Sequence, residues 1–296
     1  MFKRALLLIN GNSEQADKQK SLETVSGVIG SRVKELVIFQ TQYKGHTEAV
    51  CYEHGHEYDV IFVLGGDGTL HECVNGTALL KEPPVIGILP GGTCNDFSRS
   101  LGIPQSIKRA AESLITGDVQ YLDIGRANDR YFANFYGIGL IAETSGNINE
   151  NLKNVVGKVS YYISALQTVH QIKPFPFMLQ ADDETIQDEA VMVLITNGNY
   201  IGTNQLPFQT GEMNDGIFDV FVIREGGQAL LREYINAKTA FSFENDQTSI
   251  QHYQATEVRL ETQESMDADS DGEIYMKTPV FIQNFYKKLP FLVPYV

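Results

Sequence analysis

Basic residues are the clearest shortage in this chain of 296 residues, which carries 23 Lys and Arg against 37 Asp and Glu, for a formal net charge of −14. Proteins that bind nucleic acid need clustered positive charge to meet the phosphates, so this balance argues against a nucleic-acid partner. The acidic surface also gives no general attraction to an anionic membrane. Any membrane contact therefore has to use a local patch.

Cysteines and long apolar runs are also scarce. The chain has three cysteines, an odd number without close pairs, so we expect a reducing cytoplasm and no disulfide framework. Cys51, His54 and His56 lie close in sequence, but no further ligand is visible, so we expect a solvated helix end rather than a zinc site. The apolar run after Arg4 has five residues, too short for a signal peptide, and no run approaches the ~20 residues of a transmembrane helix.

The stretch around which the chain is organised is the Gly-Gly-Asp-Gly-Thr sequence of residues 65–69. An apolar run at 59–64 predicts a buried strand before it, and helical spacing at 69–80 predicts a helix after it. Glycines let backbone N–H groups approach an anion, and the helix N-terminus favours negative charge, so the turn suits a phosphate. The motif is neither a P-loop nor a Rossmann fingerprint.

Asp67 within this turn has two interpretations. A carboxylate beside phosphates is tolerated where it organises magnesium or water next to a nucleotide. The alternative is an ordinary strand-to-helix turn with an N-cap aspartate, which is common chemistry for glycine and aspartate.

A second unit of the same kind follows about one βα unit later. A strand is predicted at 85–89, and the sequence Pro-Gly-Gly-Thr-Cys-Asn-Asp-Phe occupies residues 90–97. Together with the 65–70 motif, Glu72 and Asn75-Gly76, this block resembles the bacterial diacylglycerol kinase-like lipid kinases, whose catalytic domain carries the GGDGT motif. NAD kinases and 6-phosphofructokinases share the shorter Gly-Gly-Asp-Gly core, so the second block is what favours the lipid kinases.

The pattern of elements changes from alternating strand and helix to strand after strand near residue 123, which marks a domain boundary. In the first part we expect strands at 4–10 and 33–39 and helices at 15–30, from 45, and at 104–117. In the second we expect strands at 119–126, 130–135, 177–179, 190–196, 218–223, 257–261 and 277–282, a glycine turn at 137–139, and a helix at 153–172.

The fold class that follows is an α/β N-terminal domain with an open parallel sheet, NAD kinase-like or phosphofructokinase-like, and an antiparallel β-sandwich C-terminal domain. The expected ranges are 1–123 for a nucleotide-binding domain and 124–283 for a β-rich lipid-substrate domain. The resemblance implies that segment 284–296 returns to the first domain and that the active site lies in the interdomain cleft.

The resemblance implies ATP and Mg²⁺ as cofactors. The nucleotide contacts it implies are Asn10, Thr41, Gly65, Gly66, Asp67, Gly68, Thr69, Leu70, His71, Gly92 and Thr93. The chain departs from the family at three places: residues 10–14 read Asn-Gly-Asn-Ser-Glu instead of Asn-Pro-x-Ser-Gly, His71 replaces an Asn, and residues 202–204 replace a run of glycines.

Two acidic motifs mark the second half. In the family, an Asp-Gly-x-x-Asp motif holds a structural magnesium, which implies the carboxylate of Asp215 with the carbonyl groups of Glu212 and Ile217. The alternative there is an Asp-Gly β-turn. The family's Asp-Gly-Glu motif falls at 271–273, which implies that Asp271 is the general base, whereas composition alone predicts a solvated acidic loop. Asp269, in the same acidic run, has no assigned role.

The predicted function is therefore an ATP-dependent lipid kinase acting on a diacylglycerol-like lipid alcohol to give phosphatidic acid. The alternatives are an NAD kinase or another soluble-substrate kinase with the same loop, or a catalytically weakened regulatory ATP-binding homologue. We expect a cytoplasmic protein with transient peripheral membrane contact, with Phe285, Tyr286, Lys287 and Lys288 as candidates for the patch. No nucleic-acid partner is expected, and a homodimer is compatible with this prediction.

Overall fold

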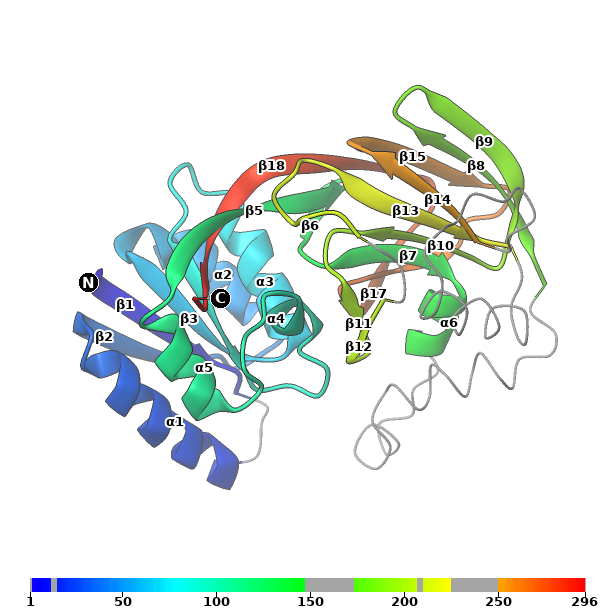
Figure 1. The fold of residues 1–296 in the computed structure, drawn as a ribbon. Helices are drawn as coiled ribbons and strands as arrows, with labels where there is room; N and C mark the ends of the chain where they lie inside the picture. The colour runs from blue at the N-terminus through cyan, green and yellow to red at the C-terminus, as the bar shows by residue number, and fades with distance from the viewer. Residues whose placement is uncertain (1, 12–14, 147–172, 207–209, 225–249, 296) are drawn as a thin grey trace. The chain divides into compact units, whose positions relative to one another are not determined.

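The computed structural model describes residues 2–11, 15–146, 173–206, 210–224 and 250–295, so the helix expected at 153–172 lies outside the described residues. The chain forms two compact units, Met1–Ile124 with Tyr286–Val296, and Gly125–Phe285. Two strands, β5 (Asp118–Ala127) and β18 (Val280–Val293), run from one unit into the other (Figure 1). None of the helices in the described ranges has the length and apolar character needed to cross a membrane.

The first unit is built on a parallel sheet with the strand order β2-β1-β3-β4. Its strands are β1 (Phe2–Ile9), β2 (Val33–Gln40), β3 (Val60–Gly65) and β4 (Val85–Pro90). β3 and β4 are apolar and almost entirely buried, as expected of parallel strands covered on both faces. The end of β18 continues this sheet, with Phe291 opposite Ile86 in a parallel pair.

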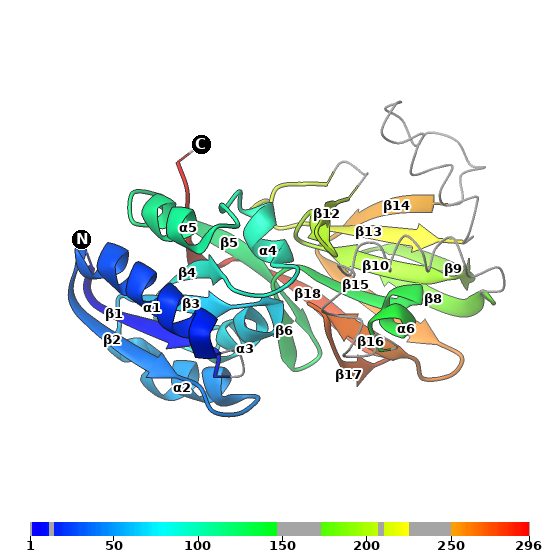
Figure 2. The same cartoon turned by 90° about the horizontal axis from the view of Figure 1, so that it is seen from below.

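Helices cover both faces of this sheet. α1 (Gln15–Gly30) and α5 (Ile107–Leu114) lie on one face, and α2 (His46–His54) and α3 (Asp67–Thr77) lie on the other (Figure 2). In the order β2-β1-β3-β4, β2 lies on one side of β1, and β3 and β4 lie on the other side. The chain therefore reverses its direction across the sheet between β2 and β3. The crevice at the carboxyl ends of β1 and β3 is therefore the topological switch point, where open α/β sheets bind ligands.

The second unit contains two antiparallel sheets packed as a sandwich (Figure 1). One sheet has the order β14-β13-β10-β7-β16-β17, and the other has the order β18-β15-β8-β9, with β5 paired to β18 and β6 paired to β5. Both contribute to one core, for example Ile138 and Val193 from the first, and Leu179, Val258 and Ile282 from the second.

The remaining elements have the following bounds: α4 (Asp96–Ser100), β6 (Arg130–Phe132), β7 (Phe135–Gly139), α6 (Leu140–Gly146), β8 (Phe175–Ala181), β9 (Glu184–Ala190), β10 (Met192–Thr196), β11 (Tyr200–Ile201), β12 (Asn204–Gln205), β13 (Phe218–Ile223), β14 (Ile250–Ala255), β15 (Glu257–Thr262), β16 (Asp267–Ser270) and β17 (Glu273–Lys277). The short 3₁₀ helix η1 (Gly55–Glu57) follows α2.

The predicted fold class is confirmed, but several local predictions are wrong. Residues 137–139 form part of β7 and not a turn, because β10 and β16 pair with β7 on both sides and satisfy its backbone groups. The strand expected at 130–135 is two strands, β6 and β7, separated by a loop at Ala133 and Asn134. The strand expected at 277–282 begins at Val280 and continues to Val293.

The cysteine and histidine cluster is only partly a solvated helix end. His54 and His56 are exposed, but Cys51 is fully buried, with its Sγ 3.6 Å from Sγ of Cys73 on α3. The contact with the Cys73 thiol and the burial both raise the pKa of Cys51, so this thiol stays protonated at neutral pH. Cys51 therefore belongs to the α2–α3 packing.

Candidate functional site

Residues predicted to contact a nucleotide meet at the switch point of the first unit. The Asn10 side-chain amide donates to Oγ1 of Thr69 at 3.2 Å, which joins the loop after β1 to the start of α3. The N–H of Gly11 donates to Oγ1 of Thr41 at 3.3 Å, which joins the same loop to the loop after β2. The structure thus brings Asn10, Thr41 and Thr69 together at the carboxyl edge of three neighbouring strands.

The departure from the family at Gly11 has a structural cause in this chain. A Cβ atom at residue 11 would lie 1.9 Å from the backbone oxygen of Thr41, so only glycine fits. A proline at this position would also lack the N–H that Thr41 accepts. Gly11 therefore suits the close contact between the two loops.

The two glycine loops touch each other through their backbones. Gly91 N–H donates to the Gly65 carbonyl at 2.8 Å. A Cβ atom on Gly66 would lie 3.0 Å from Cα of Gly92, and one on Gly92 would lie 2.4 Å from Cα of Gly66. The glycines are therefore needed for the loop-to-loop contact. Residues 91–93 are exposed and 66–68 are half-buried, so an anion can reach both loops.

The first turn of α3 faces this pair of loops. Gly66 is the N-cap residue of α3, and glycine has no side chain with which to cap the helix. A helix N-terminus presents backbone N–H groups and the positive end of the helix dipole to an anion. The side chains of Leu70 and His71 are buried, so neither of them is exposed to a ligand in this structure.

The N-cap residue of α3 is Gly66 and not Asp67, so the interpretation as an N-cap aspartate is wrong. Its Oδ1 accepts the backbone N–H of Asp96 at 2.7 Å, at the start of α4. This hydrogen bond brings the two aspartates next to each other, one from each glycine loop. Mg²⁺ in kinase sites is held by one or two carboxylates together with substrate phosphates, so these residues fit that ion.

Two further polar residues hold the loops in shape. Asn95 has a left-handed φ of 52°, and its side-chain amide accepts from and donates to the backbone of Gly92, both at 2.9 Å. Glu72 accepts the N–H groups of Gly45 at 2.7 Å and Thr47 at 3.2 Å at the start of α2. The sequence motif contained both residues, but their supporting roles depend on contacts that the motif does not show.

In the second unit, Asp271 is held by the loop between β6 and β7. One carboxylate oxygen accepts the N–H of Ala133 at 2.9 Å, and the other accepts those of Asn134 at 2.8 Å and Phe135 at 3.1 Å. Asp271 is buried and has a left-handed φ of 55°, which Asp tolerates better than most residues. The carboxylate is therefore fixed in one orientation.

The prediction of a solvated acidic loop around Asp271 is wrong. Residues 267–270 form strand β16, which pairs with both β7 and β17. Asp269 is fully buried, and its Oδ1 accepts the N–H of Gly272 at 2.7 Å in the turn that positions Asp271. Asp269 thus has a structural role, although no role was predicted for it.

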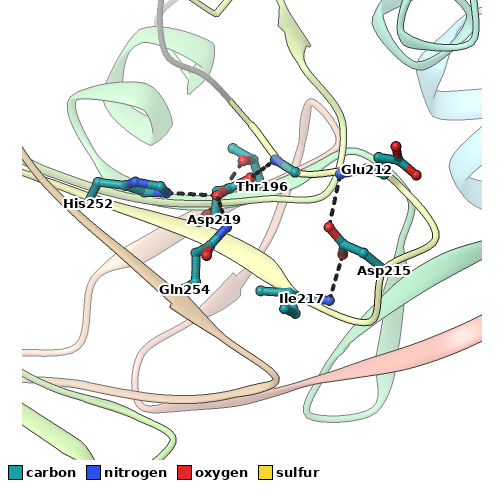
Figure 3. A network of polar contacts seen from close by, with 8 residues as sticks. Thr196, Glu212, Asp215, Ile217, Asp219, His252 and Gln254 are labelled. Atoms are coloured by element: carbon teal, nitrogen blue, oxygen red, sulfur yellow. Dashed lines mark hydrogen bonds and ion pairs between the residues drawn. The ribbon is translucent and has the colours of Figure 1, made fainter. Parts of the chain in front are cut away.

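The turn predicted to hold a metal ion is closed by Asp215 (Figure 3). Its Oδ2 accepts the N–H of Glu212 at 2.9 Å, and its Oδ1 accepts the N–H of Ile217 at 2.9 Å. The structure therefore brings the three predicted residues together. An exposed carboxylate with nearby carbonyl groups and water is a donor set that fits Mg²⁺, although the same contacts also serve an Asp-Gly turn.

A second aspartate of this motif, Asp219, anchors the turn to the sheet (Figure 3). It is buried on β13, and its carboxylate accepts the N–H of Gly211 at 2.7 Å, lies 2.7 Å from Nε2 of His252, and accepts from the Gln254 side chain at 3.2 Å. The partners on β14 follow Asp219 by 33 and 35 residues, a separation that carries no sequence signal.

Asp219→Asn should lower the free energy of unfolding by roughly 1.5–3 kcal/mol, because hydrogen bonds to a charged group are lost or weakened in a buried site. Urea unfolding would measure this loss. Asp267→Asn is the matched control: that carboxylate is exposed and pairs with Lys277, so its change should stay within about 0.5 kcal/mol. Equal effects at both positions would contradict an anchoring role for Asp219.

Comparison with known proteins matches both units. The model of the diacylglycerol kinase catalytic domain matches residues 4–127, and that of the YegS C-terminal NAD kinase beta sandwich-like domain matches residues 137–293. Proteins named "Putative lipid kinase" from Staphylococcus carnosus and Staphylococcus epidermidis are each 32% identical. Each match spans 98% of this chain, and 97% and 96% of those proteins.

Solved structures agree with the family models. A structure described as that of "a putative diacylglycerol kinase" from Bacillus anthracis has a TM-score of 0.89 and 36% identity, covering 99% of this chain and 97% of that one. Another Bacillus anthracis structure, described as a diacylglycerol kinase, has a TM-score of 0.81 and 32% identity. The chain is therefore an enzyme of the kinase class and belongs to the diacylglycerol kinase-like lipid kinase family.

Proposed function

We propose that the chain transfers the γ-phosphoryl group of ATP to the hydroxyl group of a lipid, and that this lipid is diacylglycerol. The observation that carries the nucleotide part is the contact between the two glycine loops beside the α3 N-terminus. The choice of diacylglycerol as the acceptor is supported by the names of relatives that match nearly the whole chain, which describe lipid kinases and a diacylglycerol kinase.

In this proposal, the phosphates of ATP lie on residues 65–69 and 91–93. Backbone N–H groups and the dipole of α3 stabilise their negative charge, and the glycines leave room for the phosphate oxygens. Asn10 and Thr69 hold each other in place beside these loops. Phosphoryl transfer needs little covalent help from protein, so positioning and electrostatics supply most of the rate.

Asp271 has the role of general base. As the lipid hydroxyl oxygen forms its bond to the γ-phosphorus, the bond from that phosphorus to the bridging oxygen of ADP breaks, and the carboxylate takes the hydroxyl proton. The products are phosphatidic acid, ADP and a proton on Asp271. Three backbone N–H groups fix the orientation of this carboxylate, so little ordering is needed at the moment of transfer.

Mg²⁺ would be held near the phosphates by Asp67 and Asp96, and in the second unit by Asp215 with the carbonyl groups of Glu212 and Ile217. At the first position the ion supplies positive charge that offsets the charge of the transferring phosphoryl group. The transient membrane contact, the cytoplasmic location and the homodimer stay predictions.

A comparison of two phosphoryl acceptors, each supplied separately, tests the proposed function. The purified protein would receive γ-labelled ATP with either diacylglycerol in detergent micelles or NAD in buffer. We expect label in phosphatidic acid and none in NADP. Label only in NADP would show the soluble-substrate kinase, and ATP binding without labelling of either acceptor would support the weakened regulatory homologue.

A further inference from the structure

An exposed aromatic pair lies in the loop between β2 and α2. The ring of Tyr43 stacks on the ring of His46, with centroids 4.4 Å apart and an angle of 3° between the planes. The edge of Phe39 packs against the same imidazole at 5.2 Å and 86°. Tyr43 is nevertheless 60% exposed, so one face of its ring is covered by His46 and the other faces solvent.

Hydrogen bonds hold this pair in place. Nδ1 of His46 accepts the backbone N–H of Gln42 at 3.1 Å, which ties the imidazole to the loop. Glu72 on α3 accepts the N–H groups of Gly45 and Thr47 on either side of His46. The Tyr43 ring therefore stacks on a fixed base, and a flat ligand could bind there without first ordering the loop.

The position of the loop relative to the phosphate loops suits a nucleotide. Thr41, two residues before Tyr43, bonds to the loop after β1, and Asn10 of that loop bonds to Thr69 after β3. Strands lie about 4.8 Å apart, so β2 and β3, with β1 between them, are separated by roughly 10 Å. A ribose and its linkages span a gap of this size between a base and its phosphates.

We propose that Tyr43 is the platform on which the adenine base of ATP stacks, with His46 supporting it from behind. This inference rests on the proposed function and adds the residue that positions the base. Aromatic rings bind any base through their faces, so the platform selects a flat ring rather than a particular pattern of hydrogen bonds. The same site should therefore accept GTP with similar affinity.

The absence of tryptophan from the chain gives a direct test. Tyr43→Trp would place a single indole at the platform, and its fluorescence should be strongly quenched by ATP but not by inorganic tripolyphosphate, which lacks a base. The matched control is Tyr52→Trp, because Tyr52 is 55% exposed on α2 but lies outside the loop. ATP should leave its fluorescence unchanged, and equal quenching of both indoles would overturn the proposal.

Affinity gives an independent readout. Tyr43→Ala should weaken ATP binding roughly 5- to 100-fold, as loss of a stacked base does, and leave tripolyphosphate binding unchanged. Tyr43→Phe should bind ATP like the parent, since it keeps the ring. If Tyr43→Ala binds ATP as tightly as the parent, the platform is wrong and the proposed function stands. If the parent itself binds no ATP in calorimetry, both are overturned.

Discussion

Replacing Asp271 with Asn should lower the rate of phosphoryl transfer to diacylglycerol by roughly 10²- to 10⁴-fold, the usual effect of losing a general base. Asn tolerates the left-handed backbone of residue 271, and its oxygen can still accept the N–H groups of Asn134 and Phe135. It cannot take up a proton. ATP affinity should change little, because the proposed phosphate contacts are in the first unit.

The contacts of Asp271 also give it a structural role, which the experiment has to separate from catalysis. Asn cannot accept the N–H of Ala133 through its amide nitrogen, so the variant should lose roughly 1–3 kcal/mol of stability. Turnover should therefore be measured at a temperature where thermal unfolding shows the variant to be folded. A purely structural role predicts normal turnover per folded molecule.

Asp267→Asn is the matched control for this experiment. Asp267 is in β16, the strand that ends directly before Asp271, but its carboxylate is exposed and pairs with Lys277 at the surface. Turnover should be unchanged. Asp269 is unsuitable as a control because it is buried and bonded to Gly272, next to Asp271. Equal and modest losses for Asp267→Asn and Asp271→Asn would mean that Asp271 is not the base.

Gly66→Val should abolish measurable ATP binding, which corresponds to a loss of at least roughly 100-fold in affinity. Its Cβ would lie 3.0 Å from Cα of Gly92, so the two glycine loops would have to separate. The added methyl groups would also occupy space beside the first N–H groups of α3, where a phosphate has to approach. Calorimetry with ATP and with tripolyphosphate would measure the loss of both ligands.

Gly27→Val is the control, because a side chain at residue 27 has room. Gly27 is on α1, and a Cβ atom there meets nothing within 4 Å. The variant should bind ATP like the parent and gain roughly a few tenths of a kcal/mol of stability, because Val has a higher helix propensity than Gly. If Gly66→Val binds ATP as well as Gly27→Val does, residues 65–69 are not the phosphate site.

The first unit was readily predicted because local pattern and tertiary structure agree there. The apolar runs that form β3 and β4 are long enough to be recognised as strands from the sequence alone. The glycines between each strand and the following helix mark the turns. Parallel topology then places the turns at one edge of the sheet without further information. Asn10, Thr41 and Thr69 were predicted as nucleotide contacts from the resemblance to the family, and this topology is what brings them together.

The second unit was harder because its important contacts are between residues far apart in the chain. Asp267–Ser270 has the composition of a loop, yet pairing with β7 on one side and β17 on the other makes it a strand. Asp219 was visible in its motif, but its contact with His252 depends on the register of β13 against β14. No local periodicity reveals such a register.

Labelling at two positions of ATP would show directly whether the γ-phosphoryl group alone is transferred to the lipid. The purified protein would be incubated with diacylglycerol in micelles and with ATP labelled at either the γ- or the α-phosphorus. We predict labelled phosphatidic acid from γ-labelled ATP and unlabelled lipid from α-labelled ATP. Failure of γ-labelled ATP to label the lipid, under conditions where calorimetry shows ATP bound, would contradict the proposal that this chain phosphorylates diacylglycerol.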